Sequence, residues 1–194
     1  MGGRRPYSGR RAPGRPRRFA PAPLGVDAAG RHRYTVPMSN SNLDFAVKPG
    51  EPIVSDSRCF VCGLKNDGGL RIVFYRQGDA AAVARCLPDQ RFMGYDGLLH
   101  GGVAGALLDE IMIKAVLSRG RLVVTGRMTV NYHKPIRLGA PLTLQGTITR
   151  ERARIVETKG TIADDEGTVL ASATGIYVEV TGEQRDQLAG SLGA

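Results

Sequence analysis

The chain has 194 residues, 42% of them hydrophobic, and a formal net charge of +9 at pH 7. This length suits one sizeable domain, and nine of the 27 basic residues lie in residues 1–37 beside one acidic residue, so the rest is nearly neutral. No apolar run is long enough to span a bilayer, and none follows the basic start as in a secretory signal. We therefore expect a soluble cytoplasmic protein without a membrane span, and we do not expect nucleic acid as a partner.

Residues 1–45 mix Arg, Gly, Pro and Ala with almost no periodic apolar positions, which predicts a disordered tail. Three interpretations stay open: a solvated tail without a specific role, a stretch upstream of a working start at Met38, and a transit or polyanion-binding segment. The predicted domain spans residues 46–182. Residues 183–194 are expected to form a C-terminal tail or a short frayed helix.

Cys59 and Cys62 form a CxxC pair within the stretch CFVCG. Such a pair can bind zinc, but a closed tetrahedral site needs about four ligands. Only Cys86 and three His remain, with no second pair at metal spacing. We therefore favour two reduced thiols in a turn, in a reducing compartment, and predict no metal and no other cofactor.

Alternating apolar residues and turn signals predict one hairpin, one helix and four further strands. The hairpin strands are expected at 70–76 and 80–87, and the helix at 101–118. A long strand follows within 121–136, and three more lie between 141 and 180. The predicted fold class is α+β, an antiparallel sheet of about six strands wrapped around one long central helix, because a helix that is apolar around most of its circumference needs cover on several sides. An uncovered edge strand and helix flank would then favour a homodimer, with a dimer of dimers left open.

The predicted helix begins with Gly101 and Gly102 and carries two acids near its middle. Unpaired N–H groups at a glycine helix start can hold an oxyanion, although the glycines could equally permit close packing against a strand. Asp109 shares a flank with small residues that leave room for a substrate or a neighbouring chain, so we favour it as the chemical carboxylate. Glu110 lies one turn before Lys114 and is interpreted as half of an exposed or partly exposed ion pair.

The spacing of these groups links activity to dimerisation. Gly101 and Asp109 are eight residues apart, which is about 12 Å along a helix axis. An oxyanion donor and an attacking group must both lie about 3 Å from one carbon. If both residues are catalytic, each site must therefore combine Gly101 of one chain with Asp109 of another.

The order of CFVCG, then GYDGLLHGG with an Asp nine residues after the His, then VVTGRMTVNYHKPI resembles the hotdog-fold acyl-CoA thioesterases of the phenylacetic acid degradation type. The resemblance covers about residues 57–180. It implies hydrolysis of acyl-CoA to free acid and CoA. Some relatives carry an Asn six residues before the motif His, where this chain has Gly94.

The resemblance also implies roles for individual residues. His100 matches the motif His at the helix entrance, and Gly101 matches the backbone donor to the thioester oxygen. Asp109 matches the carboxylate that attacks directly or activates water, and Thr125 matches the hydroxyl that positions the water. His100 is interpreted either as an acid–base group or as a residue that caps the helix and orients the loop.

Residues near this motif are candidates for substrate binding. Leu99 and Tyr95 could line an acyl pocket or simply cover the core, and Gly102 adds a second helix-start N–H. Lys134 and Arg137 could meet the phosphates of CoA or remain solvated.

Two other functions are alternatives for a chain of this pattern. A hydratase of the same fold pairs its Asp with a His about five residues later, but here Asp109 is followed by EIMIK. A non-catalytic acyl-CoA-binding or regulatory module stays the alternative, although no helix-turn-helix segment accompanies it.

Overall fold

A computed structural model describes residues 48–192, so the predicted tail and the predicted domain start at residue 46 lie outside it. In chain order the elements of the described part are β1 (Tyr75–Gln77), β2 (Ala81–Cys86), η1 (a 3-10 helix, Gln90–Phe92), α1 (Gly101–Leu117), β3 (Val123–Tyr132), β4 (Leu142–Arg152), β5 (Ile155–Ala163), β6 (Val169–Glu179) and α2 (Gly182–Ala189). None of its helices is long and apolar enough to cross a membrane.

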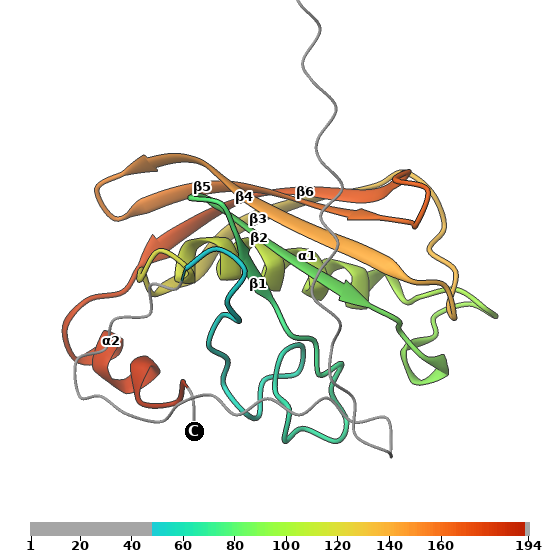
Figure 1. Ribbon diagram of the computed structural model, residues 1–194, viewed down its shortest axis with the longest axis horizontal. Helices are drawn as coiled ribbons and strands as arrows, with labels where there is room; N and C mark the ends of the chain where they lie inside the picture. Colours follow the sequence, from blue (N-terminus) through green and yellow to red (C-terminus); the bar gives the residue numbers. More distant parts are fainter. Residues whose placement is uncertain (1–47, 193–194) are drawn as a thin grey trace, which may run out of the picture. The chain divides into compact units, whose positions relative to one another are not determined.

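The strands form one sheet in the order β1-β2-β4-β5-β6-β3, and every neighbouring pair is antiparallel. The sheet curves over α1, which lies along its inner face (Figure 1). This arrangement confirms the predicted α+β hotdog fold. Strand β3 is an edge strand, and most of its residues are exposed.

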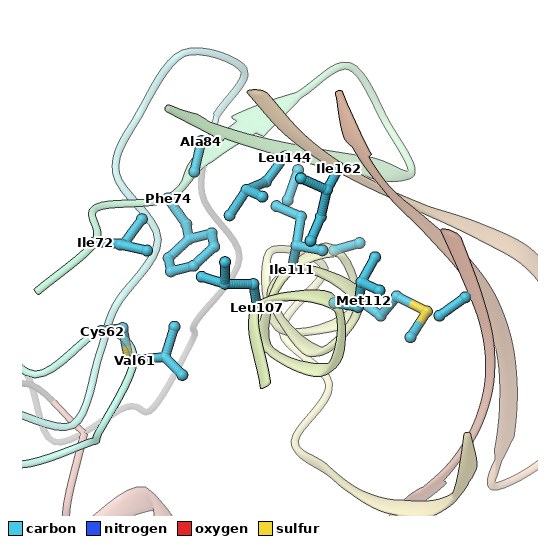
Figure 2. Packing of buried hydrophobic residues seen from close by; sticks show 14 of the residues in the cluster. Val61, Cys62, Ile72, Phe74, Ala84, Leu107, Ile111, Met112, Leu144 and Ile162 are labelled. Atoms are coloured by element: carbon cyan, nitrogen blue, oxygen red, sulfur yellow. The ribbon is translucent and has the colours of Figure 1, made fainter. Parts of the chain in front are cut away.

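Helix α1 is the centre of the hydrophobic core. His100 caps the start of α1. Three residues beyond Leu117, Gly120 has a φ of 79°, a left-handed conformation that glycine adopts without strain and that stops the helix from continuing. Leu107, Ile111 and Met112 are fully buried. Figure 2 shows the helix side chains packed against Phe74 and against Leu144 and Ile162 of the sheet.

The segment 48–74 covers a flank of α1 that the sheet does not reach, and we call it the strap (Figure 1). The predicted strand at 70–76 is wrong over most of its length, because β1 begins only at Tyr75. Leu70 and Ile72 donate to the carbonyls of Phe60 and Val61 within the strap, and Arg71 has a φ of 54°. The alternating pattern therefore predicted correctly that Ile72 and Phe74 are buried. It did not predict that the backbone of this stretch bonds within the strap instead of to a sheet strand.

The C-terminal segment is a helix over most of its length. Within α2, Ala189 is buried in the main core, and Leu192 forms a β-bridge with Asp56 of the strap. Of the two expectations for this segment, the short helix is the one observed, and the segment's apolar residues Leu188, Ala189 and Leu192 pack on the core.

Helix α1 packs tightly against the sheet at Gly146 of β4, where a Cβ atom would lie 2.3 Å from the carbonyl oxygen of Ile111. We expect Gly146→Ala to lower the free energy of unfolding by about 1–3 kcal/mol, because neither backbone can move without opening the core. Urea denaturation measures this. The control, Gly68→Ala, meets nothing nearer than 3.5 Å and should change stability little; an unchanged Gly146→Ala would contradict the helix–sheet packing.

Candidate active site

The N-terminus of α1 has one unpaired N–H group. His100 accepts the Gly102 N–H at Nδ1 over 2.9 Å, and its carbonyl accepts the N–H groups of Val103 and Ala104. Among the hydrogen bonds formed within residues 48–192, none uses the Gly101 N–H as donor. Gly102, predicted as a substrate-binding donor, therefore already has a partner, while Gly101 is free to receive an oxygen.

Packing within the chain does not explain the glycine at position 101. A Cβ atom there would lie 3.8 Å from the Tyr132 ring, an ordinary contact. Both Gly101 and Gly102 are exposed. Of the two interpretations of the helix start, the geometry favours access of a ligand to the N–H over close packing of a strand.

Asp109 is held by two hydroxyl groups of the sheet. Thr125 Oγ1 lies 3.0 and 3.2 Å from the two carboxylate oxygens, and Tyr177 OH donates to one of them over 2.8 Å. Thr125 and Tyr177 are directly opposite each other on β3 and β6, so their side chains share a face of the sheet. A β-bulge follows Thr125, where such irregularities re-aim side chains. The predicted pair of Asp109 and Thr125 is therefore brought together.

Sequence reasoning missed Tyr177. The only signal was a tyrosine at an inward position of β6, where an apolar face would take phenylalanine. Burial, together with the charge of Asp109, raises the pKa of Tyr177 well above its ordinary value. Tyr177 therefore stays protonated and donates its hydrogen to the carboxylate at any physiological pH.

One chain does not bring Gly101 and Asp109 to a common point. Helix α1 is continuous from Gly101 to Leu117, so the two residues are separated by about 12 Å along its axis. A carbonyl bound at Gly101 is out of reach of Asp109 in the same chain.

A cavity of about 330 Å³ opens beside Gly101, lined by Leu99, Gly101, Ala104, Tyr132, His133, Lys134, Pro135 and Ile136. Tyr132 OH donates to the Gly101 carbonyl over 2.8 Å. Two predicted substrate-binding residues, Leu99 and Lys134, are thus brought to the helix start. Tyr95 is 84% exposed, and neither it nor Arg137 is among the lining residues.

Glu110 and Lys114 form the predicted ion pair, with 3.4 Å between Oε1 and Nζ. The Glu110 side chain is partly exposed, at 14%, whereas Lys114 is buried at 2%, because the strap covers its end of the pair. Lys114 Nζ also donates to the Val54 carbonyl and to Ser55 Oγ. Strap contacts of this kind cannot be read from spacing along the helix.

The other oxygen of Glu110 faces the cysteine pair, since Cys59 Sγ lies 3.7 Å from Oε2. A hydrogen bond from Cys62 lowers the pKa of Cys59 to about 6, and the same contact raises the pKa of Cys62. These two cysteines and Glu110 are the residues of the described chain that could hold a metal ion together.

This fold, with a carboxylate clamped by sheet hydroxyls and a free N–H at the helix start, is that of a hotdog domain. Residues 96–171 match the family model described as Thioesterase superfamily. The described chain has the hotdog fold of the proteins in this superfamily.

Relatives and solved structures agree with this assignment. Acyl-coenzyme A thioesterase THEM4 of Bos taurus is 22% identical over 136 residues, which cover 69% of this chain and 56% of that protein. A crystal structure of a thioesterase superfamily protein has 29% identity and a TM-score of 0.60, covering 63% of this chain and 60% of the other. The Escherichia coli PaaI protein from the phenylacetic acid degradation operon shares the fold, at 20% identity and a TM-score of 0.56, covering 61% and 88%.

A hypothetical thioesterase of Streptococcus pneumoniae, solved with coenzyme A, is 25% identical with a TM-score of 0.53, covering 55% of this chain and 86% of the other. Two variants of a hypothetical thioesterase of the same organism, each 24% identical to this chain with a TM-score of 0.53, share its fold.

The contact of His100 with Gly102 separates the two interpretations of this residue. We expect His100→Ala to lower the free energy of unfolding by about 1 kcal/mol, because a helix cap is lost, whereas His100→Asn should keep both stability and activity. Thermal denaturation and acyl-CoA turnover measure the two effects. A stable but inactive His100→Asn would show instead that the imidazole takes part in the chemistry.

Proposed function

We propose that the chain hydrolyses acyl-CoA thioesters to a free acid and CoA. The observation that carries this proposal is the Asp109 carboxylate held by Thr125 and Tyr177 on the same helix whose first N–H, that of Gly101, is unpaired. A clamped carboxylate and a free donor are the two groups that acyl transfer requires. The bovine relative named as an acyl-coenzyme A thioesterase supports this chemistry, although the chain spans little more than half of that protein's length.

In the proposed reaction the thioester oxygen accepts the Gly101 N–H at the positive end of α1. In one route Asp109 removes a proton from water as the water oxygen attacks the acyl carbon, and the carbon–sulfur bond then breaks to give the acid. In the other route the carboxylate itself attacks, the carbon–sulfur bond breaks as the mixed anhydride forms, and water then hydrolyses the anhydride. In both routes the CoA thiolate leaves and takes up a proton. Thr125 and Tyr177 fix the carboxylate so that its free lone pairs face the substrate.

The site is proposed to form between two chains. Strand β3 ends the sheet with an exposed edge, and such an edge pairs readily with a second copy. Antiparallel pairing about a two-fold axis would run the two α1 helices in opposite directions, so that Gly101 of each chain approaches Asp109 of the other. A dimer has two such sites, and a dimer of dimers would have four.

The cavity at the helix start is the proposed entry for the substrate. Leu99 and Ile136 offer it apolar contact, and Lys134 offers a cation to the phosphates of CoA. Arg137 and Tyr95, both exposed, are proposed to contact CoA or acyl groups from the rim. The S. pneumoniae protein solved with coenzyme A supports a CoA thioester as the ligand class.

The direct test is release of CoA thiol from short, medium, long and aromatic acyl-CoAs. We expect Asp109→Asn to lower kcat by about 100-fold or more, since a general base or nucleophile is lost while the shape is kept. Asp79→Asn is the control, because its carboxylate is 96% exposed in a distant turn. Binding of acyl-CoA without turnover by the wild type would favour the non-catalytic binding module instead.

A second test asks whether the sites are shared. Gly101→Pro removes the proposed donor, and proline is well tolerated at the first position of a helix. His100 before it has φ −61° and ψ 132°, the extended conformation that precedes proline. Gly101→Ala, which keeps the N–H, is the matched control. We expect kcat of Gly101→Pro to fall by about 100-fold.

When Gly101→Pro and Asp109→Asn chains are refolded together, half of the dimers are mixed and each mixed dimer has one intact site. About a quarter of the wild-type activity should therefore return. Asp109→Asn mixed with Thr125→Val should regain none, because Asp109 and Thr125 act from the same chain. Failure of the first pair to recover activity would contradict the shared site.

A further inference from the structure

Cys59, Cys62 and Glu110 bring three metal-ligating atoms within 4.8 Å of one another. The two cysteines lie in the strap, and Glu110 lies on α1. Figure 2 shows Val61 and Cys62 on the flank of the helix that the strands leave open. Glu110 follows Asp109 directly but points about 100° further around the helix, so this cluster is distinct from the proposed active site.

We propose that Cys59, Cys62 and Glu110 bind one zinc ion, with water as the fourth ligand, and that the ion ties the strap to α1. The sequence alone gave no such site, because only two ligands stand at metal spacing. Folding supplies the third ligand from a residue 51 positions away from Cys59. Two thiolates with one carboxylate favour zinc over the harder cations, which prefer oxygen ligands.

The separation of the ligand atoms fits a tetrahedral ion. With a zinc–sulfur bond of about 2.3 Å and a zinc–oxygen bond of about 2.1 Å, a tetrahedral angle places sulfur and oxygen about 3.6 Å apart. Cys59 Sγ and Glu110 Oε2 are 3.7 Å apart. This pair therefore already has the separation that a tetrahedral ion needs, and Cys62 Sγ lies within 4.8 Å of both atoms.

The turn that carries the cysteines is already arranged to present a thiolate. The N–H groups of Val61 and Cys62 point at Cys59 Sγ over 3.3 and 3.5 Å. The turn closes through the Gly63 N–H and the Cys59 carbonyl, 3.0 Å apart. A Cβ atom at Gly63 would lie 2.5 Å from the Cys59 backbone, so only glycine allows a turn this tight.

Charge balance is kept when the ion binds. Without metal, the Glu110 carboxylate is neutralised by Lys114, whose Nζ lies 3.4 Å from Oε1. Zn²⁺ is bound by both cysteines as thiolates, and the charges of the ion, two thiolates, one carboxylate and one ammonium sum to zero. A buried site of this kind avoids the cost of an unpaired charge.

The test uses the full chain purified under reducing conditions, stripped of metal and titrated with Zn²⁺ against a chromophoric chelator. We expect one Zn²⁺ per chain and a higher thermal transition with zinc than with chelator. Glu110→Gln should weaken Zn²⁺ binding by about 100-fold or more, since a ligand is lost. Replacement of Zn²⁺ by Co²⁺ should give the absorption of two thiolate ligands in tetrahedral geometry.

The double variant Cys59→Ser/Cys62→Ser should bind no Zn²⁺, while Cys86→Ala, which changes a thiol outside the cluster, should bind it as the wild type does. If the double variant does not fold, Glu110→Gln alone decides the question. Zn²⁺ binding unchanged by Glu110→Gln would overturn the proposed ligand set. A reduced wild-type chain that binds no Zn²⁺ in the titration would overturn the site itself.

Discussion

The burial of α1 around most of its circumference is the constraint on which the rest of this structure depends. A sheet can cover one side of a helix, but Leu107, Leu108 and Val116 point in different directions and all are fully buried. The sheet, the strap and the end of α2 together provide that cover. Burial of a large apolar side chain contributes about 1.5–3 kcal/mol, so an uncovered flank would expose much of the stability of so small a domain.

Burial of a polar group on such a helix costs free energy unless the group has a partner, and each of the three central charged side chains has one. Asp109 receives two sheet hydroxyls, and Glu110 and Lys114 neutralise each other under the strap. The two hydroxyl groups fix the Asp109 carboxylate, to which we assign the chemistry. The pairing of Glu110 with Lys114 leaves the other Glu110 oxygen beside the CxxC turn. Both proposed sites thus follow from the same requirement, that a charged side chain on a buried helix must have a partner.

The sequence predicted the helix and the strands after it well, because the period of apolar residues in a long segment indicates both the type of element and its buried face. Helix α1 ends within one residue of its predicted end, and the long strand after it is β3. The stretch before β1 was read as a strand because Ile72 and Phe74 alternate with less buried residues. Alternation indicates which side chains are buried; it does not say whether their backbone pairs with a sheet or with a neighbouring loop.

At the candidate site, the sequence by itself determined the local features: a helix beginning with two glycines, a carboxylate eight residues after the first of them, and a separation too long for one chain to bridge. Only the tertiary structure decided which N–H remains free, since that depends on the orientation of the His100 ring. It also brought Tyr177 to Asp109 and Glu110 to Cys59, across 68 and 51 residues. Contacts within a helix follow from its fixed period, whereas contacts between distant segments depend on how the sheet curves and where the strap lies, and no local pattern encodes these.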